Sequence, residues 1–233
     1  MRARPITILL LPVLMACAAS GCATATSLPA RSLLPDDGSR PEAIERAQRT
    51  LAHVFPAAYR STQRAIITAR GKQFTCDGLL AVSPTGGHHL ALVSSFGTVT
   101  DVRVTPAGQV EVLKETPLLR ADWSRRFVAR DLQRLFIPPD RLEPAGRLAD
   151  GRLVLQTAPD AGGVTAEYIF AADGSRWEEL DLAARGQTFY RASATHYLTF
   201  PGMATEVPGE FEVNAEVYRL ELRLATLARE VPR

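Results

Sequence analysis

The sequence predicts a mostly β chain of the α+β class, in which a curved antiparallel sheet of about ten strands is covered by helices. Residues 64–117 alternate apolar and polar side chains with period two, and residues 153–224 repeat that pattern. Turn sequences rich in Pro and Gly, such as residues 83–87 and 105–108, separate the runs. Alternation bounded by Pro and Gly is typical of strands with one buried face, which another layer or a ligand must cover.

The stretch of residues 64–117 is expected to form an antiparallel meander. One parity holds its apolar side chains: Phe74, Cys76, Leu80, Val82, Leu90, Leu92, Val102, Val104, Val110 and Val112. Because side chains alternate across a strand, this set is expected on the buried face. Cys76 shares that parity, so we interpret it as a small core residue, although an unpaired thiol can also be reactive.

A first helix is predicted shortly before the meander. Ser39 can cap its start and Pro41 fits its first turn. Leu51 and Phe55 belong to an apolar stripe, and Pro56 ends the helix.

A second helix is predicted over residues 122–136, and it is the most apolar helix of the sequence. Its stripe consists of Trp123, Phe127, Val128, Leu132, Leu135 and Phe136. Asp122 can cap its start, Pro138 and Pro139 end it, and charged residues that include Asp131 fill the remaining positions. A helix directly after a meander is expected to pack across the open face of the sheet. It is either ordinary core or a lid over a cavity.

Strands are predicted again after residue 141, in runs near residues 153–155, 164–170, 177–182 and 189–200. The final run has two interpretations. Tyr218, Leu220, Leu222 and Leu224 alternate as in a strand, but a helical stripe through residues 217–231 also fits. We predict a strand.

The amino terminus has the pattern of an exported lipoprotein. Arg2 and Arg4 precede an apolar run that is too short to span a bilayer. Small residues then precede Cys22, as in a bacterial lipobox, and Cys17 is a second candidate for lipidation. A plain secretory peptide is the alternative. We expect a lipoprotein signal peptide over residues 1–21, a flexible tether over residues 22–40 and a single domain over residues 41–233, lipid-anchored at the outer membrane and facing the periplasm.

Charge and motif content exclude several function classes. The chain has 27 basic and 25 acidic side chains, and removal of Arg2 and Arg4 with the signal peptide leaves equal numbers. A neutral protein is not expected to bind nucleic acid.

No pattern of catalytic, cofactor-binding or metal-binding residues stands out, so we expect neither an enzyme nor a cofactor nor a metal. The four histidines, which include the adjacent pair His88-His89, are interpreted as surface or turn residues. The acidic residues Glu178, Glu179 and Asp181 alternate with leucines and are interpreted as the solvated face of a strand.

The order of these elements is similar to that of the LolA/LolB superfamily of periplasmic lipoprotein carriers. The similarity rests on the lipobox, the short helix, the meander, the apolar helix followed by two prolines, and the later hairpins. Within it, residues 90–97 match a strand followed by a loop that ends in Gly97, and residues 197–224 match the carboxyl-terminal part.

The resemblance implies a half-open β-barrel whose concave apolar face binds acyl chains beneath helices. In LolB-like proteins the loop before the matching glycine exposes a leucine that helps to deliver cargo to the membrane, and Phe96 occupies that place here. Ser95-Phe96-Gly97 replaces the Pro-Leu-Gly of that loop, and the ring of Phe96 can point either outward or inward.

The first functional hypothesis is therefore a monomeric, membrane-anchored lipoprotein that binds a lipid or the acyl chain of a lipoprotein. Parity and helical spacing give these candidate lining residues: Phe74, Leu80, Leu92, Val104, Trp123, Phe127, Tyr168 and Tyr218. The hypothesis requires a hollow that the protein's own side chains leave unfilled. A structural or scaffolding lipoprotein with a filled interior is the alternative, and an envelope enzyme has no support in the sequence.

Overall fold

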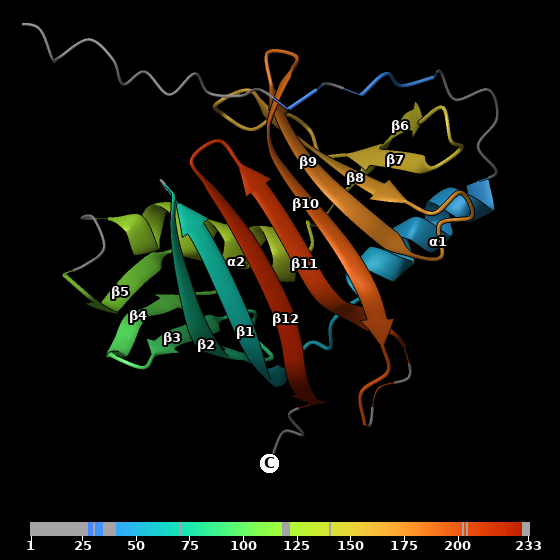
Figure 1. Cartoon of the computed structure of the whole chain (residues 1–233). Coiled ribbons are helices and arrows are strands. Elements are labelled where there is room, and N and C mark those ends of the chain that lie inside the picture. Colours follow the sequence, from blue (N-terminus) through green and yellow to red (C-terminus); the bar gives the residue numbers. More distant parts are fainter. Residues whose placement is uncertain are drawn as a thin grey trace, which may run out of the picture.

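A computed structural model of the chain describes residues 28–29, 31–34, 41–69, 71–117, 122–139, 141–201, 203 and 205–229. Within these residues, twelve antiparallel strands form one open, curved sheet (Figure 1). The predicted fold class is therefore confirmed, with two strands more than expected. The expected signal peptide and both candidate lipidation sites, Cys17 and Cys22, lie outside the described residues.

The sheet consists of two meanders that meet in its middle. The first contains β1 (Tyr59–Ala69), β2 (Lys72–Val82), β3 (His88–Ser94), β4 (Gly97–Val104) and β5 (Val110–Glu115). The second contains β6 (Glu143–Arg147), β7 (Leu153–Gln156), β8 (Val164–Phe170), β9 (Trp177–Ala184), β10 (Gln187–Leu198), β11 (Val207–Ala215) and β12 (Tyr218–Arg229). The strand order runs β5-β4-β3-β2-β1-β12-β11-β10-β9-β8-β7-β6. The run after residue 217 is thus a strand, as predicted.

The two unpredicted strands, β6 and β11, contain prolines. Pro144 lies in β6, which is an edge strand of the sheet. Pro208 pairs with Tyr197 of β10 but lies before the residues of β11 that pair with β12. Proline has no N–H to donate, and at both positions one side of the strand carries no ladder. Sequences that resemble turns are therefore compatible with strands here.

This strand order forces the chain to cross the sheet once. β5 and β6 lie at opposite edges, so the connection between them must pass over a face. It does so as the π-helix η1 (Ser124–Val128), which continues into α2 (Ala129–Phe136), and we call residues 123–136 the cover. In Figure 1 the cover passes behind strands β2, β1 and β12, across the concave face. The predicted packing of this helix across the open face is confirmed.

The helix α1 (Pro41–Ala52) packs at the other end of the concave face. Its buried stripe is Ala43, Ala47 and Leu51, and it rests on the β8–β9 turn at Gly174. Beyond it Phe55, Phe136 and Phe211 form an aromatic cluster with ring centroids 5.2–6.4 Å apart. The concave side over β9–β11 is therefore filled by side chains, and the remaining space lies beneath the cover.

Residues 28–29 and 31–34, here called the strap, lie on the convex face of the second meander. Leu28 N–H donates to the Thr188 carbonyl oxygen (3.1 Å), and Leu34 exchanges two main-chain hydrogen bonds with Arg147. Leu33 packs against a small apolar cluster of Leu148, Val154 and Ile169. This part of the expected tether thus runs along the sheet. In the described part of the chain, no helix has the length and apolar character needed to cross a bilayer.

Candidate functional site

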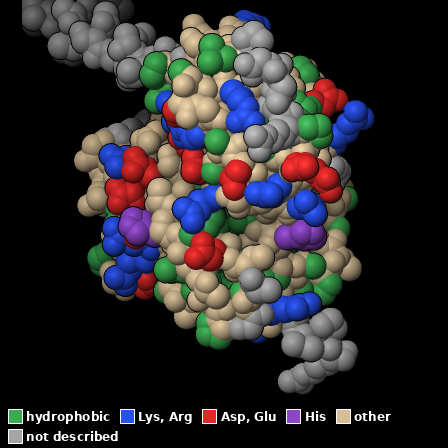
Figure 2. Space-filling view, turned by 90° about the vertical axis from the view of Figure 1, so that its right-hand side faces the viewer, with side chains coloured by type: hydrophobic (Ala, Val, Ile, Leu, Met, Phe, Trp, Pro, Cys, Tyr) green, Lys and Arg blue, Asp and Glu red, His purple; other side chains and the backbone are tan. Residues whose placement is uncertain are grey.

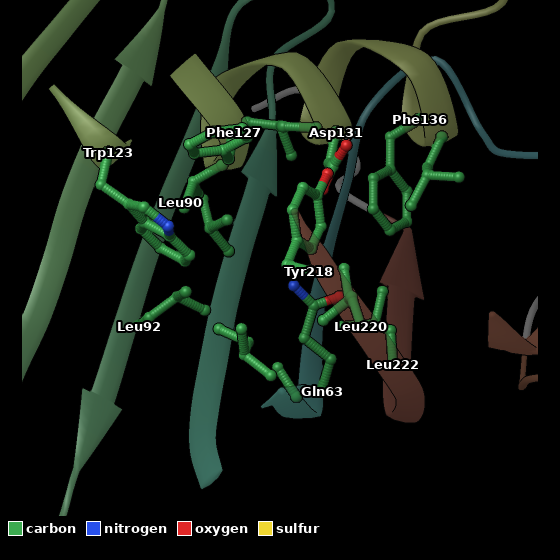
Figure 3. Close-up of a pocket in the computed structure, with 15 residues that line it drawn as sticks. Gln63, Leu90, Leu92, Trp123, Phe127, Asp131, Phe136, Tyr218, Leu220 and Leu222 are labelled. Atoms are coloured by element: carbon green, nitrogen blue, oxygen red, sulfur yellow. The ribbon is translucent and has the colours of Figure 1, made fainter. Parts of the chain in front are cut away.

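The candidate site is a small hollow between the cover and the centre of the sheet (Figure 3). Its walls come from β1, β3, β12 and the cover, and they are apolar except for Gln63, Asp131, the hydroxyl of Tyr218 and the indole N–H of Trp123. The cavity volume is about 50 Å³. An apolar cavity of about 150 Å³ binds a single benzene ring, so a hollow about one third of that size does not hold an acyl chain. The expected large unfilled hollow is therefore not present.

Four of the eight predicted lining residues face this hollow: Leu92, Trp123, Phe127 and Tyr218. Leu80, Val104 and Tyr168 are instead buried in the surrounding core. Phe74 lies near the beginning of β2, where 43% of its surface is exposed. Strand parity therefore identified the concave face but could not tell which part of that face the cover leaves open. Lipid binding by these eight residues stays a prediction.

Aromatic rings connect the cover to the sheet. The rings of Trp123 and Phe127 lie 6.0 Å apart, and Phe127 meets Tyr218 of β12 edge-on at 5.3 Å. Figure 3 shows Trp123 and Phe127 pointing from the cover toward Leu90 and the strands below. Because these contacts are apolar, an acyl chain inserted between cover and sheet would replace them by contacts of the same kind.

The start of the cover is held by β4 and β5. Glu115 accepts hydrogen bonds from the N–H (2.8 Å) and the hydroxyl (2.5 Å) of Ser124. Thr100 Oγ1 donates to Ser124 Oγ at 2.6 Å, and both residues are fully buried. Asp122, which we expected to cap the helix, has φ +64°, and no side-chain cap is formed. The N-cap position is Trp123, one residue after Asp122, and the Ser124 N–H donates to Glu115 instead.

Asp131 is the unexpected residue of the site. We placed it on the polar side of the helix, but it is 6% exposed and lines the hollow. Its Oδ2 accepts a hydrogen bond from the Tyr218 hydroxyl at 2.5 Å, which ties the cover to β12. Burial raises the pKa of Asp131 to about 6, although the Tyr218 hydrogen bond and the Arg134 guanidinium oppose that rise. In the sequence, Asp131 follows Phe127 by four residues, a spacing that puts both side chains on the same face of a helix. This spacing was the signal that Asp131 faces the hollow.

Gln63 contributes the second polar group of the hollow. It lies on β1 opposite Gly78 of β2, and it is 3% exposed. A Cβ atom at position 78 would lie 2.7 Å from the Gln63 Cγ, so the glycine provides the space that this side chain occupies. The carboxamide oxygen of Gln63 has no hydrogen-bond partner. Sequence reasoning missed Gln63, which lies just before the stretch of residues 64–117 and whose burial depends on Gly78 of the neighbouring strand.

Phe96 lies at the β3–β4 turn, where 94% of its surface is exposed. Of the two orientations that the sequence left open, the structure has the outward one. Gly97 follows with φ +108°, a conformation that favours glycine, and the Phe96 N–H donates to Ser94 Oγ at 3.2 Å. Contact of Phe96 with a membrane stays a prediction.

The acidic residues of β9 do not form a solvated face. Asp181 is fully buried beneath the strap, where Arg31 and Arg191 donate to its carboxylate at 3.0 and 2.6 Å. Glu179 pairs with Arg31 and Arg152. An open depression of about 620 Å³ lies beside these residues, but its walls combine basic and acidic side chains. Figure 2 likewise shows both signs of charge interspersed on one face of the molecule.

One histidine also departs from expectation. His88 is buried, with 3% of its surface exposed, and its Nδ1 is 2.8 Å from the Gly86 carbonyl oxygen. Burial lowers its pKa. Among the residues that the structure describes, no three His, Cys, Asp or Glu side chains gather as metal ligands would.

The open sheet, the crossing cover and the hollow beneath it define a LolA/LolB-like fold. One similar solved structure is a domain from Vibrio parahaemolyticus with a provisional assignment as an outer membrane lipoprotein-sorting protein (12% identity, 82% of this chain, 93% of that chain, TM-score 0.54). A second is a LolA superfamily protein from Nitrosomonas europaea (10% identity, 83% of this chain, 96% of that chain, TM-score 0.54). A third is a DUF1329 family protein from Desulfovibrio piger (12% identity, 82% of this chain, 93% of that chain, TM-score 0.51). At these identities the likeness concerns the fold. No protein-family model and no curated protein matches the chain.

Proposed function

We propose that this protein is a non-catalytic carrier of the cell envelope, which binds an acyl chain or a lipidated cargo between the cover and the concave face of the sheet. The observation that carries the proposal is the apolar hollow beneath a crossing helix in a LolA/LolB-like fold. Burial of apolar surface, at about 25 cal/mol per Å², is the driving force for such binding. The lipobox at Cys22 supports attachment to the outer membrane, facing the periplasm.

Binding requires that the cover move. A cavity of about 50 Å³ does not hold an acyl chain, so the cover must separate from β1, β3 and β12 as the ligand enters. Two features support such movement. The cover begins as a π-helix, a form that is frequent at functional sites, and it is preceded by a non-glycine residue with positive φ, Asp122. The cover is also a single crossing segment whose contacts to the sheet are side-chain contacts, apolar apart from hydrogen bonds at Ser124 and Asp131, so its separation leaves the ladders between strands intact.

Binding of a fluorescent fatty-acid probe to the full chain tests the proposal. We expect saturable binding that Ala65→Leu abolishes, because Ala65 of β1 lines the hollow and a larger side chain fills it. The matched control is Ala81→Leu in β2, because Ala81 points to the convex face and is half-buried there. Thermal unfolding of both variants shows that they fold. Absence of probe binding by the wild-type protein contradicts the proposal.

The small volume of the hollow favours one second candidate, a structural lipoprotein whose interior is permanently filled. In that case the cover is ordinary core and does not separate from the sheet. The probe distinguishes the two functions, because a permanently filled interior binds no fatty probe in the wild type or in either variant.

A further inference from the structure

We propose that the preferred ligand of the hollow carries a hydrogen-bond donor, as a long-chain alcohol, a hydroxylated acyl chain or an N-acyl amide does. This inference rests on the proposed carrier function and names its ligand class. Its basis is a pair of residues that line one apolar hollow from opposite sides, Gln63 on the sheet and Asp131 on the cover, each with a buried acceptor oxygen that has no hydrogen-bond partner.

The acceptor on the sheet is the carboxamide oxygen of Gln63. It is fully buried and has no hydrogen-bond partner, although nearly all buried polar side-chain atoms in proteins have one. Gln63 projects toward the concave side from β1 at the centre of the sheet, among apolar neighbours such as Leu220 and Leu222 (Figure 3). The space for it comes from Gly78, where any side chain would collide with the Gln63 Cγ. β1 therefore supplies the polar side chain and β2 supplies the space for it, at a position where an apolar side chain would otherwise pack.

The acceptor on the cover is the carboxylate of Asp131. Its Oδ2 accepts the hydrogen bond from Tyr218, whereas its Oδ1 has no hydrogen-bond partner and lies 3.7 Å from an Arg134 nitrogen. A carboxylate oxygen accepts hydrogen bonds and, when ionised, cannot donate them. An ether or an unsubstituted hydrocarbon chain therefore leaves the Gln63 oxygen unpaired, and it gives Asp131 no donor beyond the neighbouring Tyr218, Tyr190 and Arg134 side chains.

These two groups set the chemistry of the ligand. A purely hydrocarbon chain gains from the apolar walls but gives the Gln63 oxygen no hydrogen bond to accept. A ligand with one hydroxyl or amide N–H keeps the apolar contacts and also donates a hydrogen bond in a region without solvent.

The test uses two ligands that differ only in the donor. Hexadecan-1-ol and its methyl ether compete with the fluorescent fatty probe on the full chain. We expect the alcohol to displace the probe at a concentration roughly five- to tenfold lower than the ether, which is the effect of one net hydrogen bond. Gln63→Leu is expected to reduce this ratio to about one, and the control Gln73→Leu, at an exposed position of β2, is expected to retain it.

Each result decides a different point. Equal displacement by alcohol and ether in the wild-type protein overturns the donor inference and leaves the carrier function standing. If Gln63→Leu still prefers the alcohol to the ether, Gln63 is not the acceptor that causes this preference. Failure of the probe to bind contradicts the carrier function, and the donor inference with it. The wild-type comparison is decisive even if Gln63→Leu does not fold.

Discussion

Asp131 is a carboxylate that folding places between an apolar helix and the centre of a sheet. The groups that face it are Tyr218 of β12, Tyr190 of β10, and Arg134 on its own helix. The Arg134 guanidinium lies 4.7 Å above the Tyr190 ring, so the ion pair is itself held by an aromatic contact. Such a group is costly when ionised, which is why its pKa rises.

Folding stability should therefore depend on pH through Asp131. The folded-state pKa of about 6 lies above the ordinary aspartate value of 3.8, so the folded chain retains a proton that the unfolded chain has lost. This contribution is present below about pH 4 and is lost as the pH rises through about 6. Urea unfolding should show that the difference in stability between wild type and Asp131→Asn changes by on the order of 1–3 kcal/mol over that range. A difference that does not vary with pH would contradict this assignment.

Sequence patterns predicted the burial of some side chains correctly and missed that of others. Cys76 and Leu92 were placed on the buried face because strand parity is a local property. Asp181 was misjudged, because its burial depends on Arg31, a residue 150 positions away in the strap. Gln63 was missed for a similar reason, since its burial depends on a glycine in the neighbouring strand. Local pattern predicts which face a residue occupies, and long-range pairing decides what else lies there.

Among the elements, α1 is fixed by a close approach to the β8–β9 turn. A Cβ atom at Gly174 would lie 2.1 Å from the Ala43 carbonyl oxygen and 2.9 Å from the Ala47 nitrogen. Thr50 adds a hydrogen bond from its hydroxyl to the Gly174 carbonyl oxygen (3.0 Å). The small residues of α1 and the glycine of the turn together allow this contact.

Gly174→Ala should therefore destabilise the protein more than Gly186→Ala. Both glycines have φ +75°, so backbone strain of about 1 kcal/mol applies to each variant. A Cβ atom at position 186 meets nothing within 4 Å, whereas at position 174 it collides with the backbone of α1. We expect a further loss of about 2 kcal/mol or more in the free energy of unfolding for Gly174→Ala, measured with denaturant. Equal losses would show that α1 moves away without cost.

The elements themselves were largely predictable from the sequence. Ten strands and both helical segments follow from period and turn chemistry. The two missed strands, β6 and β11, contain the Pro-x-Gly and Pro-Gly sequences of residues 144–146 and 208–209, which are read as turns. Only the pairing partners show that these prolines lie where no hydrogen bond is required.

At the scale of the whole molecule, the order of strands explains where the site lies. The first and last strands, β1 and β12, pair in the middle of the sheet, and the edges are formed by β5 and β6. The chain must then cross the concave face between those edges, and the apolar cover is the segment that crosses (Figure 1). The hollow lies where this crossing passes over β1, β3 and β12. Sequence periodicity cannot give the order of strands, so the position of the hollow required the structure.

Quenching by a brominated acyl chain tests the central claim most directly, because bromine quenches tryptophan only at close range. The chain has two tryptophans: Trp123 lines the hollow, whereas Trp177 is buried in the core beside Phe211. With dibromostearate and the full chain, we predict saturable quenching in Trp177→Phe, which retains Trp123, and little quenching in Trp123→Phe. Unbrominated stearate serves as the control. Absence of quenching in Trp177→Phe would contradict entry of an acyl chain beneath the cover.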